Sequence, residues 1–344
     1  MSLAEDIRRG VLDLLGGLDL PGALGAPPDA AVEAELARFR RLLSDYPGRP
    51  GKTLRGQLVV WSARAHGASD AGGAMVLAEA LELFQNWVLV HDDIEDGSEE
   101  RRGRPALHRE VGVPVALNVG DAMHMLMWRH LLGLPPGPPL AREAAMAEFT
   151  RMLLATAAGQ HLDLAWVGAG RFDVTEAEYV RMVTLKTAYY TVVAPLRLGA
   201  MCAGATPPED LEAAAIDLGV AFQIRDDVLN LAPGAGYGKE VAGDLYEGKR
   251  TLILARLLAT LPAARRARVV AALSRPRAAK TEREMAEVLG EMHEWGAVAY
   301  AQAEAEARAA RGLAAVRRWL AGLPDQPAAA QVEALLADLA GRTA

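Results

Sequence analysis

Two aspartates at the end of a long apolar segment are the first residues whose spacing suggests chemistry. Asp92 and Asp96 stand four apart in the segment HDDIED, residues 91–96, so on a helix their carboxylates lie one turn apart on one face. Like charges repel at that spacing, and the C-terminal end of a helix disfavours anions. Mg²⁺ would offset both effects because it prefers carboxylate and phosphate oxygens. A solvated acidic helix end is the alternative, although the apolar run FQNWVLV just before it favours a buried helix.

A second acidic segment follows later in the chain. In FQIRDDVLN, residues 222–230, Asp226 and Asn230 again stand four apart, which places both oxygen-bearing side chains on one helical face. This helix also runs into a glycine-rich stretch, residues 233–238. Two such sites facing each other could hold several metal ions around one polyanion.

Cations are interleaved with the two acidic segments. Arginine recognises phosphate through a bidentate fork, and lysine offers a mobile point charge. The set therefore suggests binding of two diphosphates, although each member alone could be a surface charge. Its members are Lys52, Arg55, Arg101, Arg102, Lys186, Lys239 and Lys249.

These residues resemble the motifs of the polyprenyl diphosphate synthases, a family that includes farnesyl and geranylgeranyl diphosphate synthases. The similarity runs in order from about residue 50 to 260. It covers the segments GKTLR (51–55), DDIED (92–96), RRG (101–103), KT (186–187), FQIRDD (222–227) and GK…GD…GKRT (238–251). The chain departs from the family pattern at Pro50, Gly56 and Asn230, and Gln85 stands where many bacterial members have histidine.

The resemblance implies a magnesium-dependent prenyltransferase that condenses isopentenyl diphosphate with an allylic diphosphate through ionisation, condensation and elimination. It implies three Mg²⁺ ions, held by Asp92, Asp96 and Asp226. The residues expected to contact the allylic diphosphate are Arg101, Lys186 and Lys239. Isopentenyl diphosphate is expected on Lys52, Arg55, Gln85 and Arg102. The motifs further assign substrate-binding roles to Thr187, Gln223 and Lys249.

Product length depends on the residues just before the first aspartate. In the family, a bulky residue five positions earlier limits chain growth; Trp87 occupies that place and Val88 follows it. The pattern favours a C20 product, geranylgeranyl diphosphate, with C15 farnesyl diphosphate as the alternative. Trp87 could also be an ordinary core residue.

Two other classes of protein remain as alternatives. A terpene cyclase also uses a DDxxD segment but needs no second diphosphate site, so Lys52, Arg55 and Arg102 argue against it. A non-catalytic regulatory subunit of a synthase usually lacks one acidic motif, whereas both are present here.

The elements that must position these residues are helices. Leucine and alanine dominate, and apolar residues recur at steps of three and four, the spacing of one helix face. This pattern predicts helices over 31–45, 54–66, 74–96, 114–132, 141–166, 175–203, 208–231, 249–274, 281–320 and 328–341. No strand pattern of convincing length or internal repeat interrupts it. We therefore expect one all-α domain over residues 1–344, which by resemblance is an isoprenoid synthase fold with long helices around a central cavity.

Composition excludes several functions. A net charge of −7 without a long basic stripe argues against nucleic-acid binding. The single cysteine, Cys202, fits a reducing compartment. We expect a cytoplasmic protein because the N-terminus lacks a signal-peptide core and no long uncharged apolar run predicts a membrane span. The resemblance adds a homodimer.

Overall fold

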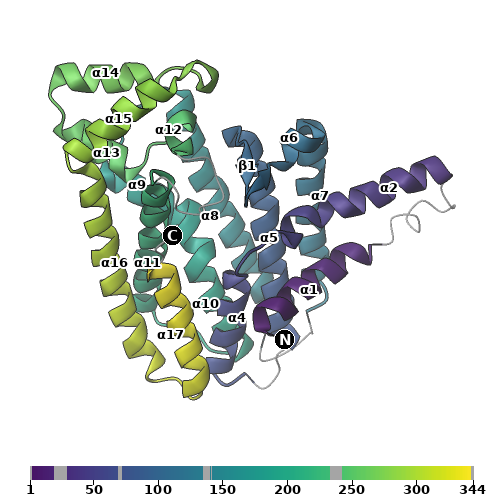
Figure 1. Ribbon diagram of the computed structural model, residues 1–344. Helices are drawn as coiled ribbons and strands as arrows, with labels where there is room; N and C mark the ends of the chain where they lie inside the picture. The colour runs from purple at the N-terminus through teal and green to yellow at the C-terminus, as the bar shows by residue number, and fades with distance from the viewer. Residues whose placement is uncertain are drawn as a thin grey trace. The chain divides into compact units, whose positions relative to one another are not determined.

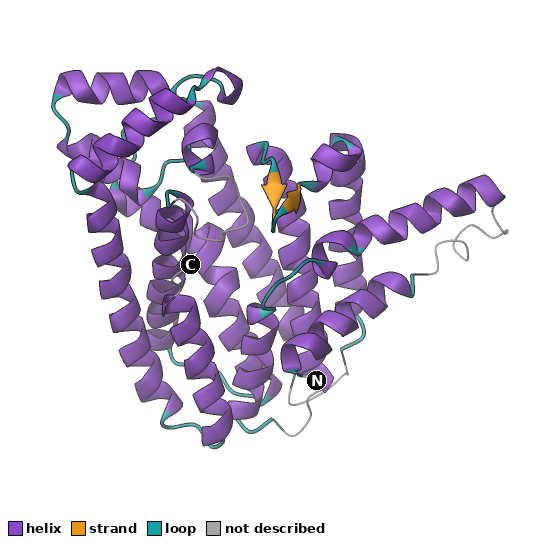
Figure 2. Ribbon diagram, in the orientation of Figure 1, coloured by secondary structure: helices purple, strands orange, loops and turns teal. Residues whose placement is uncertain are grey.

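The computed structural model describes residues 2–18, 29–68, 72–134, 140, 142–232 and 242–341. These residues are helical nearly throughout, with one antiparallel pair of two-residue strands (Figure 2). The predicted all-α fold is confirmed. The chain separates into two compact units, of which the first comprises residues 1–146 and 198–205 and the second the remainder. The expectation of one domain stays a prediction.

The first unit contains the N-terminal elements (Figure 1). They are α1 (Leu3–Gly16), α2 (Ala30–Leu43), α3 (Asp45–Gly48), α4 (Leu54–Ala65), α5 (Gly72–Asp96), β1 (Glu100–Arg101), β2 (Arg104–Pro105), α6 (Leu107–Val111) and α7 (Val113–Leu131). The first residues of α8 (Arg142–Gly168) and the last of α10 (Ala194–Cys202) also belong to it.

Helix α5 is the core of the first unit. It packs against α4 and α7, and α1 lies against both α4 and α5. Its inner face is fully buried, for example at Leu77, Leu81 and Phe84. Among the described residues, α5 is also the one helix long and apolar enough to cross a membrane, but 67% of that stretch is buried inside the protein. A buried core helix accounts for this pattern.

The second unit contains the remaining helices. They are most of α8, α9 (Glu176–Val183), the π-helix η2 (Thr184–Val193), the start of α10, α11 (Glu209–Asn230), α12 (Gly243–Glu247), α13 (Leu252–Thr260), α14 (Ala263–Leu273), η3 (Arg277–Ala279), α15 (Glu282–Glu294), α16 (Ala297–Leu320) and α17 (Gln326–Gly341). Helix α11 is central to this unit, since it packs along α16, η2 and α17; α11 and α16 lie side by side in Figure 1.

The structure differs from the periodicity in several places, three of which concern long helices. The predicted segment 249–274 is two helices, α13 and α14, because Leu261 is extended before Pro262. The segment 281–320 divides at Gly296, whose φ of 67° ends regular helix between α15 and α16. Helix α1, with its capping box at Ser2, was not predicted.

Candidate active site

The first acidic pair lies at the end of a helix, as its spacing predicts. Helix α5 ends at Asp96, and Gly97 follows with a φ of 63°. The Gly97 and Ser98 amides donate to the carbonyls of Ile94 and Asp93, the bond pattern of a Schellman motif. The Asp92 side chain is 14% exposed. Carboxylates at this negative helix end favour a bound cation.

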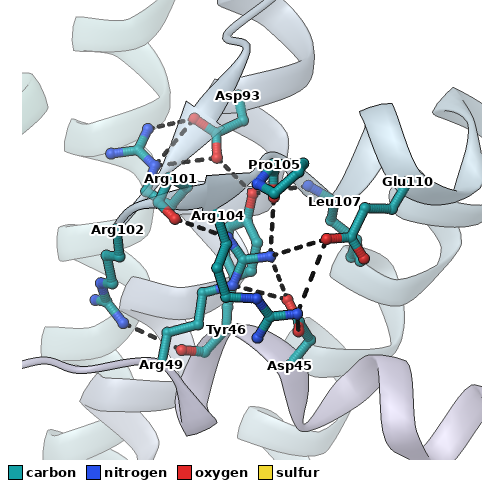
Figure 3. Close-up of polar contacts among 10 residues, drawn as sticks. All are labelled: Asp45, Tyr46, Arg49, Asp93, Arg101, Arg102, Arg104, Pro105, Leu107 and Glu110. Atoms are coloured by element: carbon teal, nitrogen blue, oxygen red, sulfur yellow. Dashed lines mark hydrogen bonds and ion pairs between the residues drawn. The ribbon is translucent and has the colours of Figure 1, made fainter. Parts of the chain in front are cut away.

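Asp93, between the two predicted ligands, is completely buried and joins three segments of the first unit (Figure 3). Arg101 donates from Nε to both carboxylate oxygens at 3.0 Å, and its Nη2 also pairs with Asp93. The Tyr46 hydroxyl donates to Oδ2 at 2.5 Å and accepts from the Leu107 amide at 3.1 Å. This network fixes Arg101 with Nη2 3.6 Å from Asp92.

The charges of this network depend on one another. Burial alone would lower the pKa of Arg101, but the Asp93 carboxylate outweighs burial and raises that pKa above its usual value. Burial raises the pKa of Tyr46, and the Asp93 carboxylate raises it again. Tyr46 therefore stays a neutral donor, and Arg101 stays charged.

Arg101 and Arg102 belong to a tight hairpin. Strands β1 and β2 pair Arg101 with Arg104, and the two residues between them both have positive φ, 54° at Arg102 and 73° at Gly103. Two positive φ angles at a two-residue hairpin turn are typical of type I′. The buried Arg49 side chain holds this hairpin by donating to the carbonyls of Arg101 at 2.8 Å and Pro105 at 3.0 Å (Figure 3).

Three of the predicted isopentenyl diphosphate residues lie around the start of α4: Lys52, Arg55 and Arg102, whose Cζ is 3.4 Å from a Cβ built at Gly51. The Gly56 amide of α4 donates to the buried carboxylate of Glu82 on α5, at 2.9 Å. Burial raises the pKa of Glu82, whereas the Gly56 bond and the guanidinium groups of Arg55 and Arg102 oppose that rise. Gln85, 7% exposed, has a buried amide oxygen with no hydrogen-bond partner in the described part of the chain. The first unit thus brings together cations and an available polar group.

Trp87 faces α7. Its ring stacks on His124 with centroids 4.1 Å apart and an interplanar angle of 12°. Its Nε1 donates to His91 Nδ1 at 3.3 Å, and Phe84 meets it edge-on. Trp87 and Val88 are both half-buried. The tryptophan is therefore held in one orientation.

A pocket in the second unit brings together four of the other predicted residues. Lys186, Thr187, Gln223 and Lys249 line it together with Asp163 and Asp227. Lys186 Nζ lies 2.5 Å from Asp163 Oδ2, and the Asp163 side chain is 7% exposed. Lys249 Nζ lies 3.3 Å from Glu247. A polyanion in this pocket would therefore meet two ammonium groups, each of which also faces a carboxylate.

A chain of hydrogen bonds crosses this pocket. Thr187 donates to the Gln223 amide oxygen at 2.9 Å, and Gln223 donates to Asp227 Oδ1 at 2.8 Å. Tyr179 donates to the other Asp227 oxygen at 2.7 Å. Burial raises the pKa of Asp227 to about 7, although the bonds from Gln223 and Tyr179 act to lower it.

Lys186 lies in the π-helix η2, between α9 and α10. Helices of this type are rare and are found frequently at functional sites. Two glycines let neighbouring helices approach it. A Cβ at Gly159 of α8 would lie 2.2 Å from the Lys186 backbone nitrogen, and one at Gly219 of α11 would lie 2.4 Å from the Ala188 Cα. Close packing from two sides therefore fixes Lys186.

The second acidic motif is divided between two roles. Asp226 is half-buried on α11, whereas Asn230 is buried and its side-chain oxygen accepts from the Asp244 amide at 3.1 Å. Asn230 thus anchors α12. Lys239 and the glycine-rich segment beside it lie outside the described residues.

The residues present fit magnesium by donor type. Asp92 and Asp96 offer carboxylate oxygens one turn apart, and Mg²⁺ is commonly bound by one or two carboxylates plus phosphates and water. No group of three histidine, cysteine or acidic side chains arranged for a metal occurs within the described ranges. The phosphate oxygens of a bound substrate would be suitable further ligands.

Several residues that contact the predicted site residues belong to none of the sequence motifs. Asp163, Tyr179 and Glu82 are found only through their contacts. The sequence does single out Asp163, because it is the one acidic residue in the apolar stretch 162–167 of α8. Asp93 and Asp227 stand inside the motifs, but their spacing does not reveal that they face inward.

An all-helical fold with arginines and lysines near motif aspartates is that of one class of protein, the helical prenyltransferases. The family model named polyprenyl synthetase matches residues 37–292. A short chain isoprenyl diphosphate synthase of Methanothermobacter thermautotrophicus is 34% identical over 258 residues, 74% of this chain and 76% of that protein. A (2E,6E)-farnesyl diphosphate synthase of Mycobacterium bovis is 36% identical over 296 residues, 83% and 80% of the two chains.

A solved structure agrees. Geranylgeranyl pyrophosphate synthase from Corynebacterium glutamicum, complexed with isoprenyl diphosphate and magnesium, matches with a TM-score of 0.82 and 25% identity, over 99% of this chain and 100% of that one. Among the relatives, geranylgeranyl is the most common product in the name, with farnesyl as the alternative. The chain belongs to the polyprenyl synthetase family, whose members are magnesium-dependent prenyltransferases acting on isoprenyl diphosphates.

Proposed function

We propose that the chain elongates an allylic diphosphate with isopentenyl diphosphate to give C20 geranylgeranyl diphosphate. The observation that carries this proposal is that cations lie near a motif aspartate in each unit. Asp92 lies 3.6 Å from Arg101 in the first unit, and Lys186 and Lys249 line the second unit's pocket together with Asp227. Each unit therefore supplies groups suited to a magnesium diphosphate.

The metal ligands in this proposal are Asp92, Asp96 and Asp226, and the number of Mg²⁺ ions is three. When bound, the metal neutralises charge that develops on the departing diphosphate. Arg101, Lys186 and Lys239 hold the allylic diphosphate by charge-assisted hydrogen bonds. Thr187 and Gln223 orient the same pocket through their shared hydrogen bond, and Lys249 adds a further cation.

Isopentenyl diphosphate binds on Lys52, Arg55, Gln85 and Arg102. The allylic carbon–oxygen bond breaks, and the electron pair leaves with the diphosphate, whose charge the lysines stabilise. The isopentenyl double bond then attacks the allylic cation, forming the new carbon–carbon bond. A proton is then lost to the released diphosphate, whose oxygens can accept it.

Trp87 limits the product length in this proposal. Its stack on His124 and its bond to His91 hold the indole in place, so a growing chain that reaches it would meet a rigid wall. A fixed aromatic ring five residues before Asp92 would stop chain growth early. This supports a C20 product, with C15 as the alternative.

The active form in this proposal is a cytoplasmic homodimer. Helix α7 carries exposed apolar side chains, which a second copy would cover; they include Val113, Val115, Leu117, Met125 and, just past its end, Leu132. Size-exclusion chromatography with light scattering measures the oligomeric state and tests the proposed dimer. Met125→Lys should shift a dimer toward monomer, and a wild-type monomer at micromolar concentration would contradict it.

Product analysis tests the reaction itself. Purified protein is incubated with Mg²⁺, isopentenyl diphosphate and each allylic primer in turn, and products are resolved by chain length. We expect C20 from wild type, loss of product with EDTA, and no turnover from a folded Asp92→Ala variant. Wild-type rates from Asp92→Ala would exclude its metal role, and absence of elongation with every primer would exclude the proposed reaction.

A further inference from the structure

Helix α1 lies outside the region that the family model matches, residues 37–292, yet it contacts the turn that carries the predicted isopentenyl diphosphate cations. Arg8 donates from Nη2 to the Gly51 carbonyl oxygen. The Thr53 hydroxyl lies 3.3 Å from the Ala4 carbonyl oxygen and 2.8 Å from that of Lys52. The first turns of α1 thus hold the turn 51–53 from one side.

This turn needs such support because its backbone is strained. Thr53 has a φ of 44° and a ψ of 41°, the left-handed region that β-branched residues strongly disfavour. Arg102, which approaches the same turn, has a φ of 54°. Strained residues of this kind persist only where the surroundings fix them, and they cluster at functional sites.

Three arginines gather around a buried carboxylate beside this turn. The guanidinium groups of Arg8, Arg55 and Arg102 all lie close enough to Glu82 to act against the rise in its pKa. A side chain at Gly51 would lie 3.4 Å from Cζ of Arg102, and Gly51 also accepts the bond from Arg8. Guanidinium groups gathered in this way are suited to binding phosphate oxygens.

Gln85 lies three residues after Glu82 on α5, one helical turn away. Its buried amide oxygen has no hydrogen-bond partner among the described residues, although leaving such a group unsatisfied costs free energy. An ordered water that hydrates a bound anion would donate to this oxygen.

We infer that Arg8 is a positioning residue for the isopentenyl diphosphate site. It anchors the Gly51 carbonyl and so orients Lys52 and Arg55, and it adds positive charge to the cluster around Glu82. The inference rests on the proposed function, because the ligand of this cluster is taken to be the diphosphate of isopentenyl diphosphate. Helix α1 therefore contributes to the binding of isopentenyl diphosphate.

Arg9 provides the matched control. It is the next residue of the same helix and pairs with Asp6 at 2.7 Å on the surface. Arg8→Gln and Arg9→Gln both remove one guanidinium from α1, but only the first removes the bond to Gly51.

The experiment is steady-state kinetics on the full-length enzyme, with each substrate varied in turn. Losing a partly exposed charge-assisted hydrogen bond should raise the KM for isopentenyl diphosphate about threefold to tenfold in Arg8→Gln. The KM for the allylic primer, kcat and the melting temperature should stay near wild-type values. Arg9→Gln should match wild type throughout.

Two results would overturn the inference alone. One is equal KM values for isopentenyl diphosphate in the two variants. The other is an Arg8→Gln enzyme that melts early and loses affinity for both substrates together, which would show a general structural role. A wild-type enzyme that elongates no primer would instead remove the proposed function, and this inference with it.

Discussion

Asp93 gives the sharpest test of how the first unit is held together. The substitution Asp93→Asn keeps the size of the side chain but removes the negative charge that faces Arg101 at 3.0 Å and accepts from Tyr46 (Figure 3). Arg101 is 8% exposed and would remain charged in a buried position. The variant therefore leaves a buried charge without its closest partner.

The magnitude follows from that geometry. Removing one partner of a buried ion pair typically costs about 3–5 kcal/mol. Two features favour the lower end: Asp92 lies 3.6 Å from Arg101 and takes over part of the pairing, and asparagine keeps one oxygen for the Tyr46 hydroxyl. We expect Asp93→Asn to lower the free energy of unfolding by about 3 kcal/mol.

Denaturant titration followed by circular dichroism measures this change, with thermal melts as a second readout. Glu95→Gln is the control, since Glu95 is exposed two residues further along α5, and exposed substitutions usually change stability by less than about 0.5 kcal/mol. An Asp93→Asn variant as stable as Glu95→Gln would refute the reasoning, because the Arg101 charge would then not depend on Asp93.

Three further predictions concern close packing, product length and titration. Gly159→Ala should destabilise the protein and strongly reduce turnover, because its Cβ would lie 2.2 Å from the Lys186 backbone nitrogen. Gly168→Ala on the same helix, where a Cβ would meet no atom within 4 Å, should change neither stability nor turnover. Equal melting temperatures and rates for the two variants would contradict this prediction. Trp87→Ala should lengthen the product by at least one isoprene unit in chain-length analysis, and an unchanged product would show that another residue stops growth. Burial lowers the pKa of Lys280 from 10.5 to about 8, so between those values the unfolded chain binds more protons and the free energy of unfolding should rise with pH. Lys280→Met should flatten that slope in denaturant titrations, and an unchanged slope would assign the titration to another group.

The motif-bearing helices follow from sequence because their signals are local. The periodicity of α5 and the acidic spacing at its end predict both the helix and the common face of Asp92 and Asp96. Divisions within longer helical patterns are harder. Gly296 and Pro262 end helices within segments whose apolar spacing continues on both sides, so periodicity alone joins what the backbone separates.

The sequence by itself determined the helical class, the two acidic motifs and the family, since each is written in residue types at short, fixed spacing. Tertiary structure alone decided which groups meet: Tyr46 and Asp93 are 47 positions apart, and Lys186 and Asp163 are 23 apart. It also decided that Asp93 is buried while Asp92, its neighbour, keeps access to solvent. Such pairings depend on how helices pack against one another, and packing joins residues whose separation along the chain carries no local signal.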